Sequence, residues 1–127
     1  MTEHVLDASA LLALLQLETG YEKVAAVVAV SRASAVNLAE AGSHLTNAGD
    51  TLAHVQAQLD SLGVDVVPFD EEQAIETARL RPLTRSLGLS LGDRACLALA
   101  RKLQLPAMTT DRAWAKLSLS IEVNVIR

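Results

Sequence analysis

Cysteine, aromatic residues and long apolar runs are all scarce in this chain of 127 residues. Cys96 is the only cysteine, which excludes a disulfide within the chain and is typical of a reducing compartment. One tyrosine, one phenylalanine and one tryptophan provide no aromatic platform on which the bases of a single-stranded nucleic acid would stack. The apolar run Ala10–Leu15 is too short to span a bilayer and follows no basic segment, so we expect a cytoplasmic protein without a membrane or export segment.

Half of the residues are hydrophobic, and a chain of this length can bury one core of useful size but not two. We therefore expect a single domain over residues 1–127, with a core built mainly from Ala, Leu and Val.

The formal net charge of −4 is unevenly distributed along the chain. Residues 1–78 hold 2 basic and 12 acidic side chains, whereas residues 79–127 hold 9 basic and 3 acidic ones. The sum argues against a surface that coats nucleic acid in general. The basic second half could still hold a phosphate backbone close to a group of acids.

The segment Leu89–Asp111 places one acid before a helix and another after a strand. Ser90 is a good N-cap, so the spacing predicts a helix over residues 91–103 with Asp93 in its exposed first turn. Pro106 ends the helical pattern, and residues 107–110 read as a buried strand that stops just before Asp111. Both acids also have a purely structural interpretation, because Asp93 completes a capping-box pattern and Asp111 precedes a short helical turn.

Two more acids stand near predicted strands. Asp7 follows the first apolar strand of the chain, and we expect Ser9 to cap the helix that comes next. On the helix predicted from residue 35 to about residue 45, Asn37 and Glu40 share one face. The mostly apolar composition of that helix favours a functional Glu40 over an ordinary solvated one.

The rest of the chain alternates between strand and helix patterns. Strands are predicted at residues 32–34, 64–69 and 121–126, and helices at 21–30, 51–62 and 71–86. Pro82 is expected to interrupt the last of these helices. This order predicts an α/β fold with a parallel sheet, helices on both faces and the final strand at one edge.

The four acids are expected to converge on one edge of that sheet. Open parallel sheets bind ligands beside the carboxyl ends of their strands, where Asp7 and Asp111 both lie. The helix and strand between Asp93 and Asp111 run in opposite directions, so both acids return to the same edge, within reach of Glu40. Carboxylates this close repel one another, which indicates a cation among them. Oxygen ligands without clustered Cys or His favour Mg²⁺ or Mn²⁺, and metal-assisted phosphodiester hydrolysis is the chemistry that fits.

Four segments resemble the motifs of PIN-domain proteins, most closely the VapC-type toxins of bacterial toxin–antitoxin pairs. They read VLDASALLAL from Val5, SAVNLAE from Ser34, LSLGDRACLALA from Leu89 and TTDRAW from Thr109. Their order along the whole chain makes the resemblance specific. It implies a PIN-like three-layer α/β/α sandwich with a mainly parallel central sheet flanked by helices.

The resemblance also implies an activity and its partners. The activity is that of a Mg²⁺- or Mn²⁺-dependent endoribonuclease, which cuts RNA to leave a 5′-phosphate and a 3′-hydroxyl. The partners are a second copy of the chain, in a homodimer, and a VapB-like antitoxin whose C-terminal segment fills the acidic groove.

Each motif assigns roles to residues of this chain. The metal ligands are Asp7, Asp93 and Asp111, with Glu40 as a further ligand or as the residue that positions the attacking water. Hydrogen-bonding partners around them are Ser9, Asn37 and Thr110. Two arginines next to acids would contact substrate phosphate or pair with carboxylates, namely Arg94 and Arg112.

Two other functions stay open from the sequence. An acid-site phosphatase or a phospho-receiver also uses acids at strand ends, but a haloacid-type phosphatase needs a second aspartate where Ser9 stands, and a receiver needs a lysine after the last strand but one. The other alternative is a PIN-like module that binds RNA or protein without cutting. The complete set of four acids counts against such a module.

Overall fold

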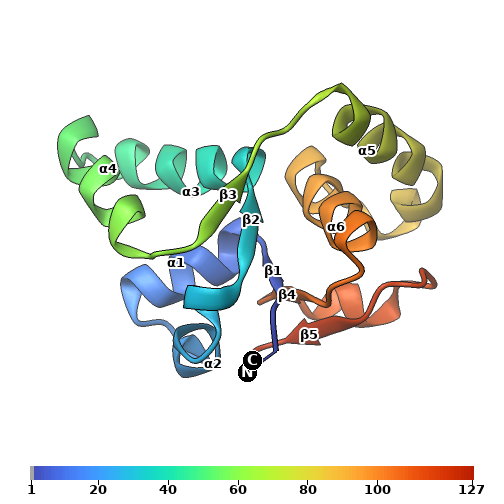
Figure 1. The fold of residues 1–127 in the computed structure, drawn as a ribbon, viewed down its shortest axis with the longest axis horizontal. Coiled ribbons are helices and arrows are strands. Elements are labelled where there is room, and N and C mark those ends of the chain that lie inside the picture. The colour runs from blue at the N-terminus through green and yellow to red at the C-terminus, as the bar shows by residue number, and fades with distance from the viewer. Residues whose placement is uncertain (1) are drawn as a thin grey trace.

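The shortest strand of the protein lies at the centre of its sheet. The computed structural model describes residues 2–127, and in it β1 (Val5–Leu6) is the middle of five strands in the order β3-β2-β1-β4-β5 (Figure 1). The other strands are β2 (Arg32–Ser34), β3 (Asp65–Val67), β4 (Ala107–Thr109) and β5 (Val123–Val125). All four neighbouring pairs are parallel, which confirms the predicted parallel sheet with its last strand at one edge.

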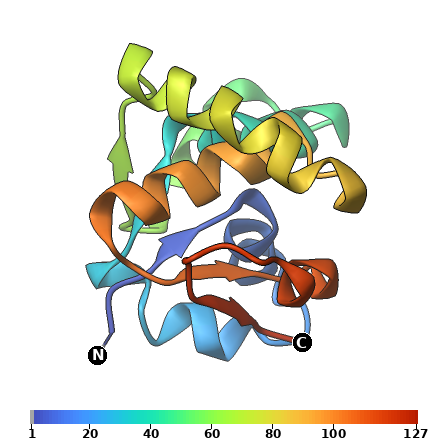
Figure 2. The ribbon, with the colours of Figure 1, turned by 90° about the vertical axis from the view of Figure 1, so that its right-hand side faces the viewer.

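Six α-helices connect and cover these strands. They are α1 (Ala8–Gln16), α2 (Tyr21–Ala25), α3 (Ala35–Asn47), α4 (Leu52–Ser61), α5 (Glu71–Thr84) and α6 (Leu91–Leu103). Figure 2 shows α5 and α6 on one side of the sheet and the α1–α2 segment on the other. The predicted α/β fold with helices on both faces is thus confirmed. Within residues 2–127, no helix combines the length and the apolar character that a membrane span requires.

Consecutive residues of β1 point to opposite faces of the sheet, and each face has its own core. Val5 belongs to a buried cluster with Leu80 of α5 and Leu97 of α6. Leu6 belongs to a second cluster with Leu11 of α1. Because both residues of β1 are fully buried, the carboxyl end of this strand, where the chain continues into Asp7, is held from both sides.

The predicted courses of two helices are wrong. Helix α5 continues through Pro82 and ends at Thr84, after which a 3-10 turn follows at Arg85–Leu87. Pro82 does not divide the helix, which ends two residues after it. The helix predicted over residues 21–30 is also divided, into α2 and a 3-10 turn at Val28–Val30.

Candidate active site at the carboxyl edge of the sheet

Asp7 follows β1 directly and is the N-cap of α1. Its Oδ1 accepts the backbone N–H of Ala10 at 2.8 Å, and its backbone is extended, as is usual for an N-cap. The prediction that Ser9 caps this helix is wrong, because the helix begins at Ala8. Ser9 instead donates a hydrogen bond from its hydroxyl to Asp7 Oδ1 at 2.6 Å. The serine therefore helps to hold the carboxylate.

A threonine of β4 binds the other oxygen of Asp7. The hydroxyl of Thr109 donates to Asp7 Oδ2 and accepts the backbone N–H of Asp111 at 3.1 Å. Thr109 was not predicted as part of the site. The resemblance assigned this role to its neighbour Thr110, whose backbone N–H donates to Ser9 Oγ at 3.0 Å. The signal for Thr109 lies in the strand register, because pairing of Leu6 with Met108 puts the next residue of β4 beside Asp7.

Burial dominates the electrostatics of Asp7. The residue is 4% exposed, and the loss of water raises the pKa of its carboxyl to about 6. Hydrogen bonds from Ser9, Thr109 and Ala10 act in the opposite direction, and the charge of Asp93 raises the pKa further. Ionised Asp7 is therefore costly in the free protein, and a cation beside it would stabilise the charged form.

Asp93 completes the N-terminal cap of α6 and also acts by its charge on two of the other acids. Its Oδ2 accepts the backbone N–H of Ser90 at 2.9 Å, while the Ser90 hydroxyl accepts the N–H of Asp93 at 3.2 Å. This capping box and the predicted helix over residues 91–103 are both confirmed. The charge of Asp93 also raises the pKa of Asp7 and of Glu40. A carboxylate has enough lone pairs to cap the helix and bind a cation together.

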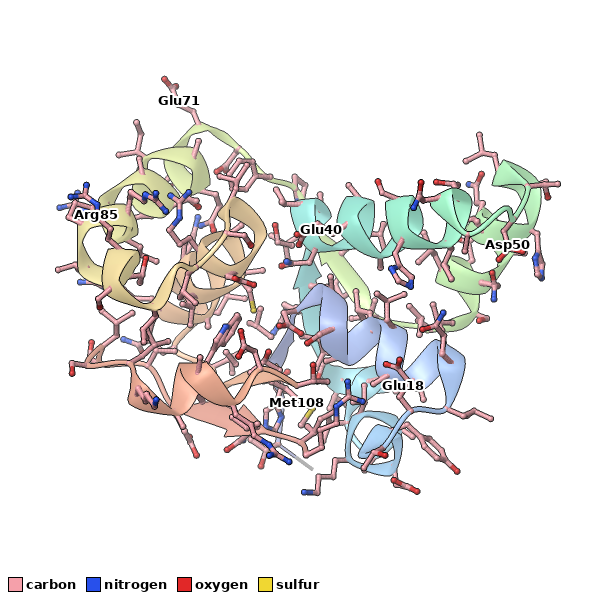
Figure 3. The ribbon with its side chains drawn as sticks, turned by 180° about the vertical axis from the view of Figure 1, so that it is seen from behind. Glu18, Glu40, Asp50, Glu71, Arg85 and Met108 are labelled. Carbon is pink, nitrogen blue, oxygen red and sulfur yellow. The ribbon has the colours of Figure 1, made fainter. Side chains whose placement is uncertain are left out.

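Helix α3 brings Glu40 to the first turn of α6. The side-chain amide of Asn37 donates to Glu40 Oε1 at 2.9 Å and to the backbone oxygen of Gly92 at 3.0 Å. Figure 3 shows Glu40 where α3 approaches the half of the molecule that holds α5 and α6. Glu40 as a whole residue is exposed, but partial burial of its carboxyl, together with the charge of Asp93, raises its pKa.

Three of the four acids thus form one electrostatic group. The thiol of Cys96 lies buried in α6, and its pKa is raised first by burial and then by the charges of Asp7, Asp93 and Glu40. Asp111 is exposed and caps a 3-10 turn by accepting the N–H of Ala113 at 2.9 Å. It is connected to Asp7 through the Thr109 hydroxyl, which contacts both residues.

The two arginines named in the sequence analysis both donate to backbone oxygens. Arg94 lies against α5, where its Nη1 donates to the oxygen of Thr77 at 3.0 Å. Arg112 is exposed, and its Nε donates to the oxygen of Arg127 at 3.1 Å. Neither forms an ion pair with the neighbouring acids within the part of the chain that the structure describes.

The acids suit a hard divalent cation that keeps part of its water. Among residues 2–127, no three His, Cys, Asp or Glu side chains are gathered tightly enough to hold a metal ion by themselves. Mg²⁺ does not need such a cage, because it commonly takes one or two carboxylates, several waters and the phosphates of a substrate. The repulsion between Asp93 and its two neighbours is what such a cation would relieve. The donor set therefore fits Mg²⁺ or Mn²⁺.

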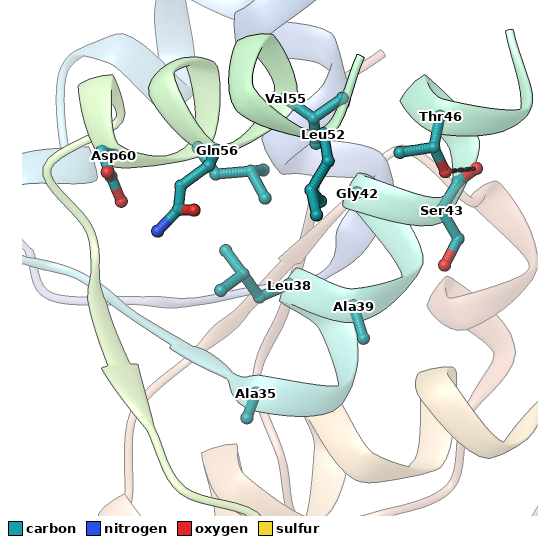
Figure 4. A pocket seen from close by; sticks show the side chains of 11 residues that line it. Ala35, Leu38, Ala39, Gly42, Ser43, Thr46, Leu52, Val55, Gln56 and Asp60 are labelled. Carbon is teal, nitrogen blue, oxygen red and sulfur yellow. Dashed lines mark hydrogen bonds between the residues drawn. The ribbon is translucent and has the colours of Figure 1, made fainter. Parts of the chain in front are cut away.

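An apolar hollow lies away from these acids, between α3 and α4. Its volume is about 510 Å³, and Figure 4 shows side chains of both helices around it, among them Leu38, Leu52 and Val55. Leu52 is 73% exposed. None of the four acids lines this hollow.

The protein has an open parallel α/β sheet with acids beside the carboxyl ends of its central strands. Proteins of this architecture bind their ligands at that edge of the sheet. Residues 4–119 match the PIN domain family, and the chain belongs to this family. No curated protein sequence matches the chain.

Solved structures share the fold at low sequence identity. A toxin–antitoxin complex from Klebsiella pneumoniae superposes with a TM-score of 0.75 and 16% identity, covering 98% of each chain. DNA-bound VapBC from Salmonella typhimurium has a TM-score of 0.75 and 17% identity, again with 98% of each chain covered. The toxin VapC20 from Mycobacterium tuberculosis, described as cleaving the sarcin–ricin loop, has a TM-score of 0.75 and 17% identity over 91% of this chain and 95% of its own.

Proposed function

We propose that this protein is a Mg²⁺- or Mn²⁺-dependent endoribonuclease that acts as the toxin of a VapBC-like pair. The observation that supports this most directly is the electrostatic group of Asp7, Glu40 and Asp93 at the carboxyl edge of the sheet, where Asp93 raises the pKa of both other acids. Membership of the PIN family and similarity in fold to a VapC toxin agree with this proposal.

Each residue of the site would have its own role. Asp7 and Asp93 would hold the cation with Glu40, and Asp111 would complete the site from the far side of Thr109. A divalent cation bound there supplies charge neutralisation at the scissile phosphate and lowers the pKa of an attacking water. Ser9 and Thr109 would keep the two Asp7 oxygens in place by their hydrogen bonds. Glu40 would bind the cation directly or position the water.

Incubation of the purified protein with total RNA tests the activity. We expect cleavage with Mg²⁺ or Mn²⁺, none with EDTA, and products with a 5′-phosphate and a 3′-hydroxyl. Asp7→Asn and Asp93→Asn should both lose cleavage, whereas Asp60→Asn, an exposed acid on α4, should cut as the wild type does. Cleavage that persists in both site variants would contradict the assignment. RNA binding without cleavage would favour the non-cutting module, and release of phosphate from phosphomonoesters would favour the phosphatase.

The toxin role requires an antitoxin. Its C-terminal segment would fill the acidic groove, and we assign the hollow between α3 and α4 to another part of the same partner as a docking surface. The exposed Leu52 beside this hollow suits an apolar segment of a partner protein. The structures similar to this chain include toxin–antitoxin complexes, which agrees with a partner of this kind.

A small DNA-binding protein encoded immediately upstream is the partner to test. On co-expression it should co-purify with this chain and suppress RNA cleavage, and Leu52→Asp should weaken both effects without changing the activity of the free protein. If the partner still suppresses RNA cleavage by Leu52→Asp completely, the hollow is not its docking surface. We also expect a homodimer, which light scattering on the purified protein would detect, and a cytoplasmic location, where cellular RNA is accessible.

A further inference from the structure

The backbone of Gly92 lies directly beneath the carboxylate of Glu40. A Cβ built on Gly92 would be 2.0 Å from Glu40 Oε1, 2.2 Å from Cδ and 2.3 Å from Oε2. All three atoms of the carboxylate thus occupy the space that any other residue would fill with its side chain. Atoms that are not bonded to each other do not come this close, so the position of Glu40 depends on a glycine at residue 92.

The backbone conformation of Gly92 does not explain the glycine. Gly92 is in the first turn of α6, where alanine would favour the helix more than glycine does. Gly42, in α3, provides a comparison within the same fold, because a Cβ there would approach Leu59 no closer than 3.4 Å, an ordinary contact. A glycine is therefore needed at residue 92 because the Glu40 carboxylate lies so close to its backbone.

Asn37 ties the two partners of this contact together. One amide nitrogen donates both to Glu40 Oε1 and to the backbone oxygen of Gly92, and the Asn37 residue is 1% exposed. An amide that is buried and makes two hydrogen bonds has little freedom to move. It fixes the carboxylate of Glu40 against the backbone next to Asp93, although the charge of Asp93 opposes ionised Glu40.

We infer that Gly92 is a positioning residue, whose missing side chain makes a seat that holds the Glu40 carboxylate beside Asp93. This inference rests on the proposed function, because it gives the seat its purpose at the cation site. The atoms displaced by a Cβ are the far end of a flexible side chain, so Gly92→Ala should fold, with Glu40 turned out to solvent. The variant would then have an intact helix and a site that lacks one acid.

Binding of Mn²⁺, measured by electron paramagnetic resonance of the free ion, tests the seat. We expect Gly92→Ala to bind Mn²⁺ about tenfold more weakly than wild type, without a fall in Tm, and Gly42→Ala to bind as wild type does. In a Glu40→Ala background, adding Gly92→Ala should cause no further loss, because the group on which the seat acts is already absent. Wild-type affinity in Gly92→Ala, or equal losses in both backgrounds, would overturn the inference.

A measurement without metal separates the seat from the proposed function. The NMR signals of the Asn37 side-chain amide should shift in Gly92→Ala toward their positions in Glu40→Ala, because both changes remove the acceptor Glu40 Oε1. Unshifted signals in Gly92→Ala would contradict the seat even if the wild type binds Mn²⁺ and cuts RNA. If the signals shift but the wild-type protein neither binds Mn²⁺ nor cuts RNA, Gly92 does position Glu40. The proposed role of this contact at a cation site would then be wrong.

Discussion

The hydroxyl of Thr109 in β4 donates a hydrogen bond to Oδ2 of Asp7, which stands 102 residues earlier in the chain. The same hydroxyl accepts the backbone N–H of Asp111. One buried side chain therefore contacts two acids, each of which follows one of two neighbouring parallel strands. Loss of such a supporting contact typically lowers metal affinity by about tenfold to a hundredfold.

Thr109→Val should weaken Mn²⁺ binding and RNA cleavage by about tenfold to a hundredfold, because valine keeps the volume but loses both hydrogen bonds. Loss of the hydrogen bond to Asp7 should also raise the pKa of that carboxyl further. The free energy of unfolding should fall by about 1–3 kcal/mol, since polar groups that pair with Thr109 lose their partner. Titration with Mn²⁺ and thermal unfolding measure the two effects.

Thr110→Val is the matched control for this change. Thr110 contributes its backbone N–H to Ser9, and valine keeps that N–H. We expect the control to retain wild-type Mn²⁺ affinity. A large loss in Thr110→Val with little effect of Thr109→Val would reverse the assignment and return the role to the residue selected from the sequence.

Asp7→Asn should stabilise the metal-free protein at neutral pH. The pKa of Asp7 is about 6 in the folded protein and near 3.8 when exposed, so between these values the folded state holds a proton that the unfolded state has lost. The wild type therefore loses up to about 3 kcal/mol of stability from this group as the pH rises from 4 to 7. Asparagine carries no such charge, and the Thr109 hydroxyl can rotate to accept its amide.

Urea unfolding of metal-free wild type and Asp7→Asn between pH 4 and pH 7.5 would measure this difference. The variant should be the more stable protein at pH 7.5, and the two curves should approach each other toward pH 4. Asp60→Asn, on exposed α4, should follow the wild type at every pH. The opposite result would be a wild type that becomes more stable than Asp7→Asn as the pH rises from 4 to 7. It would show that the ionised Asp7 carboxylate does not destabilise the folded protein.

The features that local patterns determine were predictable, including the capping box of α6 and the order of strands and helices. Ser90 and Asp93 interact across three residues, so their spacing alone identifies them. The role of Thr109 depends on the register between β1 and β4, which no local pattern contains. The seat at Gly92 depends on how closely α3 approaches α6, a distance that arises only from packing.

The error at Ser9 has a similar origin. Both Asp7 and Ser9 are good N-caps, and the sequence offers no means to choose between them. The structure selects Asp7 because β1 ends at Leu6 and α1 begins at Ala8, which leaves a single residue between strand and helix. Asp7 is therefore placed at the carboxyl edge of the sheet and is buried there, and this burial is the main cause of its raised pKa.

Asp93→Asn should lower the pKa of both Glu40 and Asp7, because it removes a negative charge that raises each of them. Asparagine can still accept the N–H of Ser90, so the cap of α6 should survive. Carbon-detected NMR titration of the two carboxyls measures the shifts. Asp111→Asn is the comparison and should leave the pKa of Glu40 unchanged, because Asp111 is not among the groups that perturb it. Equal shifts in both variants would mean that all four acids form one group in solution.

Addition of Mn²⁺ should raise the Tm of the wild type, and the increase should grow with pH. A ligand that binds only the folded state stabilises it by about 2.7 kcal/mol at a concentration one hundred times its dissociation constant. Below pH 6 a proton on Asp7 competes with the cation, so the increase should be small at pH 5 and large at pH 7.5. Asp7→Asn should show little increase at either pH, and EDTA should reverse the effect in the wild type. An increase that is as large at pH 5 as at pH 7.5, or that survives in Asp7→Asn, would place the cation away from Asp7.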